Sequence, residues 1–150
     1  MKLIRSLFTV SMCALSVCAT IACAQSAPRI HDVESLSWMP SAAPGLELAV
    51  VEGNPQGPGP YVVAMRYKAG TTTPPHSHPE EMNLVVVKGQ FFVGVGDRAE
   101  SSGNKMLNPG SVVVIPKGSH HSEGAITDSI VLLYGSGPMR IDLVGGFLEH

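Results

Sequence analysis

The residues of this chain best suited to chemistry are two histidines separated by a single residue, His76 and His78. Alternate side chains of an extended strand project from the same face, so the two imidazoles would lie a few ångströms apart, in a metal-chelating geometry. Pro74, Pro75 and Pro79 stiffen the surrounding backbone and exclude a helix. The pair is therefore expected on a strand or a strand-like loop. Taken alone, it is equally consistent with two exposed histidines.

A third candidate follows an apolar run later in the chain. Residues 112–115 read Val-Val-Val-Ile, residues 116–119 read Pro-Lys-Gly-Ser, and His120 and His121 come next. This order predicts a strand, a tight turn and another histidine. Adjacent residues of an extended chain point to opposite faces, so only one of the two histidines can join the first pair.

Both segments resemble the sequence motifs of the cupin superfamily. The first motif runs Gly, five residues, His-x-His, three or four residues, Glu, six residues, Gly; the second runs Gly, five residues, Pro-x-Gly, two residues, His. The matching residues are Gly70, His76, His78 and Gly89 in the first, and Gly110, Pro116, Gly118 and His121 in the second. One departure is Met82, which stands where the family most often has a ligand glutamate. The resemblance covers about residues 45–145, and it is closest to small single-domain bacterial cupins with an export signal.

This resemblance implies an all-β fold, an antiparallel jelly-roll (cupin) barrel, in which His76, His78 and His121 converge on one metal ion. The spacing from Gly118 favours His121 over His120. The implied cofactor is a divalent transition metal (Fe, Mn, Zn, Ni or Cu), and neutral imidazole ligands suit Zn, Fe, Ni and Cu.

Met82 and Glu81 are uncertain further ligands. By strand parity Met82 shares a face with the histidine pair, and a ligating thioether would favour copper, especially Cu(I), over Mn or Mg. Filling the core with a flexible apolar side chain is the alternative. Glu81 would reach inward only if Pro79 introduces a bulge; by parity with His78 it points away.

Short alternating segments separated by turn residues predict the strands of an antiparallel sandwich or barrel. They are expected over residues 46–52, 61–68, 83–87, 90–95, 111–115, 119–123, 129–134 and 139–144. In the second of these, the apolar face formed by Tyr61, Val63, Met65 and Tyr67 should point inward. Side chains that would line the cavity beside the metal, if they do not simply pack in the core, are Tyr67, Phe92, Tyr134 and Met139.

The first 24 residues are expected to be a signal peptide. Lys2 and Arg5 supply the charged start, residues 7–22 are mostly apolar, and Ala-Cys-Ala at 22–24 fits a cleavage site. This predicts a periplasmic or secreted protein. A lipoprotein anchored at Cys23 is the nearer alternative, and a membrane-spanning anchor is the other, although polar residues interrupt the apolar stretch.

Cleavage after residue 24 would leave an arm over residues 25–44 and a cupin domain over residues 45–150. All three cysteines would be lost, so the mature chain would have no disulfide. Without Lys2 and Arg5 it would carry 8 Lys and Arg against 12 Asp and Glu, a net charge of −4. That balance gives no support to nucleic-acid binding, which requires a basic surface. No membrane association is expected after cleavage, and a homodimer is left open.

Two functions agree with these residues. One is a metal-dependent enzyme of the dioxygenase, isomerase or lyase type that acts on a small organic molecule. The alternative is a non-catalytic envelope protein that binds a metal ion or small ligand. The missing motif glutamate and the lack of an evident acid or base near the histidines favour the second. The first is favoured only by the fact that many cupins are enzymes, and by no residue of this chain. The fold by itself does not decide function.

Overall fold

The computed structural model describes residues 26–98 and 103–145, and the statements below concern this part of the chain. The signal peptide expected over residues 1–24 lies outside it. Here the chain consists of antiparallel strands and one short 3-10 helix, η1 (Val33–Ser35). None of the helices in this part is long and apolar enough to cross a membrane.

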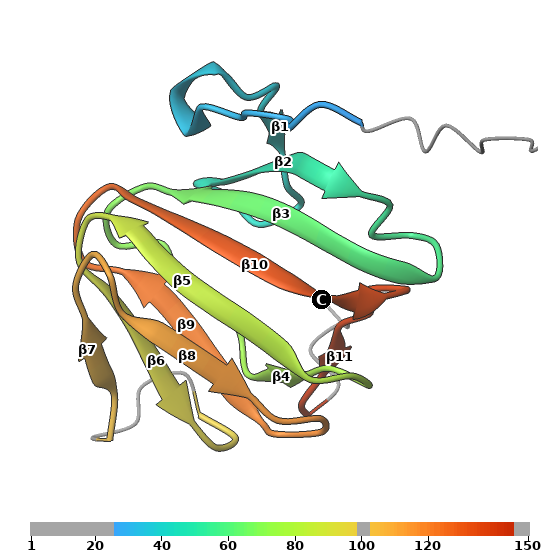
Figure 1. Ribbon diagram of the computed structural model, residues 1–150. Coiled ribbons are helices and arrows are strands. Elements are labelled where there is room, and N and C mark those ends of the chain that lie inside the picture. The colour runs from blue at the N-terminus through green and yellow to red at the C-terminus, as the bar shows by residue number, and fades with distance from the viewer. Residues whose placement is uncertain (1–25, 99–102, 146–150) are drawn as a thin grey trace, which may run out of the picture.

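Eleven strands form two antiparallel sheets that face each other (Figure 1). The first sheet has the order β1 (Met39–Pro40), β2 (Leu46–Gly53), β3 (Gly59–Tyr67), β10 (Ser129–Gly137), β5 (Met82–Lys88) and β8 (Val112–Ile115). The second has the order β11 (Asp142–Leu143), β4 (His76–Ser77), β9 (His121–Ala125), β6 (Phe91–Val95) and β7 (Lys105–Leu107). This confirms the jelly-roll prediction, with the difference that no strand pairing closes the two sheets into one continuous barrel.

The core lies between the sheets and follows from the alternation seen in the sequence. Along β3 the side chains of Tyr61, Val63, Met65 and Tyr67 are all buried and belong to one apolar cluster. Leu84 of β5 lies in the same cluster and is fully buried. Burying an aliphatic side chain of this size contributes roughly 1.5–3 kcal/mol to folding, so the inward faces of β3 and β5 hold the first sheet against the second.

The turn between β5 and β6 requires glycine. Gly89 has φ of 83°, a left-handed conformation that residues with a side chain rarely adopt. A Cβ atom there would also collide with the Asp128 carbonyl and the Ser129 side chain. This last residue of the first cupin motif therefore allows the chain to pass from the first sheet into the second.

The two ends of the described chain differ from the expected elements. The strand expected over residues 139–144 is reduced to β11, because the amide of Met139 donates to the Pro55 carbonyl (2.7 Å) and not to a neighbouring strand. The arm expected over residues 25–44 contributes a strand, β1, which pairs with β2. Trp38 in the arm stacks on the guanidinium of Arg66, 4.5 Å from the ring centroid. The arm is thus part of the fold's outer layer.

Candidate metal centre

The structure brings His76, His78 and His121 together between the two sheets. His76 on β4 is the direct cross-strand partner of His121 on β9, and His78 follows β4 immediately. The ring centroids are 4.3 Å apart for the cross-strand pair, and His78 lies 4.9 and 5.3 Å from His76 and His121. One nitrogen from each ring falls within 4.8 Å of the others, and all three side chains are buried.

Backbone carbonyls orient the three rings. Nδ1 of His76 lies 2.8 Å from the Pro74 oxygen, Nδ1 of His78 lies 2.7 Å from the Arg140 oxygen, and Nδ1 of His121 lies 2.9 Å from the Ser119 oxygen. A carbonyl only accepts hydrogen bonds, so each Nδ1 must be the donor and a neutral ring keeps its lone pair on Nε2. Metal-ligating histidines are typically fixed in this way by a second hydrogen bond.

Burial keeps two of the rings in the form that binds metal. Desolvation lowers the pKa of His78 and of His121 below the usual value, and this exceeds the opposing influence of nearby hydrogen bonds and of Glu123. Neutral imidazole is therefore favoured at neutral pH. Nε2 of His121 is buried and has no hydrogen-bond partner. A buried acceptor without a donor is costly unless a cation occupies its lone pair, so these residues fit a metal ion.

The second cupin motif positions the site through its turn. The amide of Gly118 donates to the carbonyl of His78 (2.9 Å), which ties the turn before β9 to the end of β4. His121 then enters β9 facing inward, whereas His120 is exposed and its Nδ1 lies 2.6 Å from Asp97. Of the two adjacent histidines, His121 is the one that reaches the cluster.

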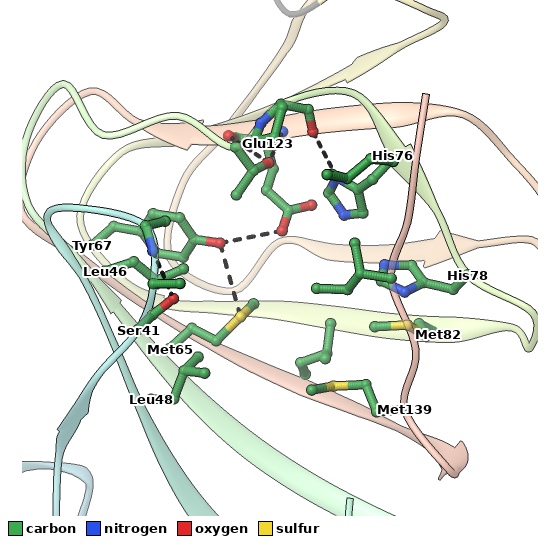
Figure 2. Close-up of a pocket in the computed structure, with 17 residues that line it drawn as sticks. Ser41, Leu46, Leu48, Met65, Tyr67, His76, His78, Met82, Glu123 and Met139 are labelled. Carbon is green, nitrogen blue, oxygen red and sulfur yellow. Dashed lines mark hydrogen bonds between the residues drawn. The ribbon is translucent and has the colours of Figure 1, made fainter. Parts of the chain in front are cut away.

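A buried carboxylate, Glu123, stands beside the cluster and was not anticipated from the sequence. It lies two residues after His121 on β9 and is only 5% exposed. Its Oε2 is 3.5 Å from Nε2 of His121, and its Oε1 accepts a hydrogen bond from the Tyr67 hydroxyl (3.2 Å; Figure 2). The signal was present, since His121 and Glu123 alternate on one predicted strand. The expectation that no acid or base lies near the histidines is therefore wrong.

Hydrogen bonds hold both the backbone and the side chain of Glu123. Its amide donates to the Thr73 hydroxyl (3.1 Å), and its carbonyl accepts from the Thr73 amide (2.8 Å). Burial first, and then the charge and hydrogen bond of Glu123, raise the pKa of Tyr67 well above its usual value. Tyr67 therefore keeps its proton and remains a donor to the carboxylate.

His76, His78 and Glu123 line a cavity of about 350 Å³ between the sheets. Its walls are mainly apolar, as Figure 2 shows for the labelled Leu46, Leu48, Met65, Met82 and Met139. Further lining residues are Ser41, Ala42, Ala43, Tyr67, Thr73, Pro74, Leu133, Ile141 and Leu143. No lysine or arginine is among the described residues that line it. A volume of this size accommodates a small organic molecule.

Comparison with known families agrees with this architecture. Residues 26–140 match the ChrR Cupin-like domain. The chain belongs to this family of cupins. The match includes the arm over residues 26–44, in keeping with the pairing of β1 and with the presence of Ser41, Ala42 and Ala43 in the cavity wall.

Among curated proteins this cupin is similar to plant germin-like proteins over part of its length. It is 41% identical to germin-like protein 9-1 of Oryza sativa subsp. japonica over 61 residues, which is 39% of this chain and 25% of that protein. The chain covers between 25% and 46% of the length of the germin-like relatives it matches.

Solved structures show the same fold. KdgF from Halomonas sp. is 25% identical with a TM-score of 0.58, covering 73% of this cupin and 94% of that chain. The polyketide cyclase RemF from Streptomyces resistomycificus has a TM-score of 0.66 at 18% identity, covering 83% of this cupin and 89% of that chain. At such identities the likeness concerns the fold.

Of four further residues predicted for the site, three line the cavity and one does not. Met82, Tyr67 and Met139 line the cavity, and Figure 2 draws Met82 near His78. Glu81 is exposed and does not line it, as expected if no bulge reverses the parity after His78. Whether Met82 ligates a metal stays a prediction.

The other two residues predicted to line the cavity, Phe92 and Tyr134, are not among the described residues that line it. On β6 the inward residue is Phe91, which packs edge-on against Tyr67 at 5.0 Å; the ring of Phe92 lies over Gly124 on the other face. On β10 the inward residue is Leu133, whereas Tyr134 is 38% exposed. Side chains alternate along a strand, so an error of one residue moves the side chain to the opposite face.

Proposed function

We propose that this cupin is a metal-dependent enzyme that acts on a small, largely apolar organic molecule in the cavity between its sheets. The observation that supports this proposal best is the cluster of three buried histidines whose Nδ1 atoms are all held by backbone carbonyls, leaving Nε2 for an ion. Dioxygenase, isomerase and lyase reactions all agree with such a centre.

A bound ion would supply a Lewis acid or a redox centre with a position left for the substrate. His76, His78 and His121 would hold it, and the apolar walls would exclude water from the bound molecule. Glu123 and Tyr67 place a carboxylate and a hydroxyl next to the histidines, within the same cavity. A bound molecule could therefore make polar contacts with these two groups as well as apolar contacts with the walls.

The cavity walls favour an uncharged substrate. No lysine or arginine is found among its described lining residues, so a substrate carboxylate would have no protein cation to pair with and would face the carboxylate of Glu123. Burying such an anion without a partner is costly, although a metal ion could offset part of the cost. Phenols, thiols and other neutral molecules are the better candidates than small acids.

The test is metal content and turnover of the purified protein. We expect one equivalent of a transition metal in the wild type, and a loss of affinity of more than about 100-fold in His121→Ala. His120→Ala is the matched control, because this neighbouring histidine is exposed and pairs with Asp97. Oxygen uptake and product formation are then measured with a panel of phenols, thiols and small acids. Absence of metal binding by the wild type would end the proposal.

A non-catalytic binding protein is the second candidate, and Met82 favours it. A thioether adds no charge and no proton-transfer group at the position where most cupins have glutamate. Under this alternative, ligands from the panel would bind to the metal-loaded protein in calorimetry but would be recovered unchanged. Multiple turnovers of any panel compound would exclude it.

We also propose that the protein acts outside the cytoplasm, in the periplasm or after secretion. This proposal depends on the sequence of residues 1–24 alone. A homodimer stays a prediction as well, and sedimentation velocity of the purified protein would measure it.

A further inference from the structure

We propose that Glu123 is a ligand of the metal centre, so that β9 supplies the carboxylate that the first cupin motif of this chain lacks at Met82. The centre would consist of His76, His78, His121 and Glu123. This inference rests on the proposed function, because it assumes that the site holds a metal ion.

The contact between Glu123 and His121 is the first support. Oε2 of Glu123 lies 3.5 Å from Nε2 of His121, and with Nδ1 donating to the Ser119 carbonyl this Nε2 carries a lone pair. Two acceptors therefore face each other without a hydrogen between them. A metal ion held by His121 and Glu123 would supply the positive charge that two facing acceptors require, and nitrogen and carboxylate oxygen are both usual zinc ligands.

The charge of Glu123 is the second support. A carboxylate that is 5% exposed needs a cation or several hydrogen bonds to offset its desolvation. Among the described residues that line the cavity there is no lysine or arginine, and the single side-chain donor shown to it is the Tyr67 hydroxyl. A divalent cation held by the neighbouring imidazoles would provide the missing positive charge.

The carboxylate is also oriented for this role. Thr73 fixes the backbone of Glu123 through its amide and hydroxyl, and Tyr67 holds Oε1. Oε2 is thereby left free to face Nε2 of His121, 3.5 Å away. Figure 2 shows the hydrogen bond of Tyr67 to the Glu123 carboxylate, with His76 beside it. If the carboxylate ligand comes from Glu123 on β9 and not from position 82 on β5, the side of the ion near Met82 is lined by apolar groups. That side would then be available to the substrate.

The experiment is titration of Zn²⁺ and Mn²⁺ into chelator-treated protein by calorimetry. Glu123→Gln keeps the size of the side chain and an acceptor for Tyr67, but removes the charge. We expect its affinity for both ions to fall at least about 10- to 100-fold. Glu81→Gln is the matched control, since Glu81 is exposed and outside the cavity lining, and its affinity should equal that of the wild type. Adding Met82→Glu to Glu123→Gln should restore part of the loss.

The outcomes separate this inference from the proposed function. If the wild type binds metal and Glu123→Gln binds it within about threefold as tightly, Glu123 is not a ligand and the inference is overturned, while the proposed function stands. If the wild type binds no metal, the proposed function fails. Should Glu123→Gln not fold, a crystal structure of the zinc-loaded wild type decides the question. A Zn–Oε2 distance of about 2.0–2.2 Å is expected, and one above about 3 Å would overturn the inference.

Discussion

Replacing Tyr67 with phenylalanine removes one hydroxyl from the interior and tests how the carboxylate beside the histidines is held. Tyr67 is fully buried, and its hydroxyl donates to Oε1 of Glu123 at 3.2 Å, with Met65 Sδ at 3.8 Å as a weaker alternative. A hydrogen bond to a charged group contributes about 1.5–3 kcal/mol, and its loss leaves the buried carboxylate without that donor. We therefore expect the metal-free Tyr67→Phe variant to be about 2 kcal/mol less stable.

Tyr61→Phe is the matched control for this change. Tyr61 is buried on the same face of β3, and its hydroxyl has no hydrogen bond to any described residue. Its replacement should therefore change the unfolding free energy by less than about 0.5 kcal/mol. The two variants remove the same atom from the same strand, so their difference isolates the bond to Glu123.

Urea unfolding followed by the fluorescence of Trp38, the single tryptophan, measures both variants. A loss of about 2 kcal/mol would lower the midpoint by roughly 1 M urea for a protein of this size. A double-mutant cycle with Glu123→Gln should give a coupling of at least about 1 kcal/mol between positions 67 and 123. If Tyr67→Phe and Tyr61→Phe are equally stable, the hydroxyl of Tyr67 does not support the carboxylate and the account of this contact is wrong.

Three further predictions concern protonation, metal preference and processing. The pKa values of His78 and His121 are lowered in the folded state, so the unfolded chain binds more protons and the metal-free protein should lose stability as pH falls below about 6.5; unfolding midpoints constant between pH 7 and pH 5 would contradict this. Met82→Glu should raise the affinity for Mn and Fe relative to Cu(I), and unchanged affinities would show that residue 82 does not reach the ion. N-terminal sequencing of exported protein should begin at Gln25, whereas a lipid-modified Cys23 would refute soluble export.

Much of the fold was predictable because the alternation of apolar residues and the positions of turn residues in the sequence agree with the strand pairing in the structure. The alternation of Tyr61, Val63, Met65 and Tyr67 identified the inward face of β3, and that face packs in the core. Turn residues likewise identified the ends of most strands. The short strand β7 was not anticipated, since three residues carry too little pattern and β7 forms only by pairing with β6.

The error over which phenylalanine of β6 points inward has a physical cause. The face that Phe91 and Phe92 present depends on how β6 pairs with β9, where Phe91 lies opposite Ala125 and Phe92 opposite Gly124. A Cβ atom at Gly124 would collide with the ring of Phe92, so the absence of a side chain there makes room for that ring on the outer face. Two adjacent phenylalanines give no local signal of direction. Only the partner strand, far along the chain, supplies it.

The histidine cluster was predicted from the sequence, whereas the carboxylate of Glu123 beside it was missed. His76 and His78 share a face within one short segment, so their geometry follows from strand alternation alone. Glu123 follows His121 by the same spacing, and the same rule places both on one buried face once β9 is recognised as a strand. A motif with glutamate in its first half directs attention to Met82 and Glu81 instead. What an ion requires is a donor at the right point in space, and strands from either sheet can deliver it. A carboxylate missing from one motif should therefore be sought at every alternate position on the strands that carry the histidines before the site is judged to lack one.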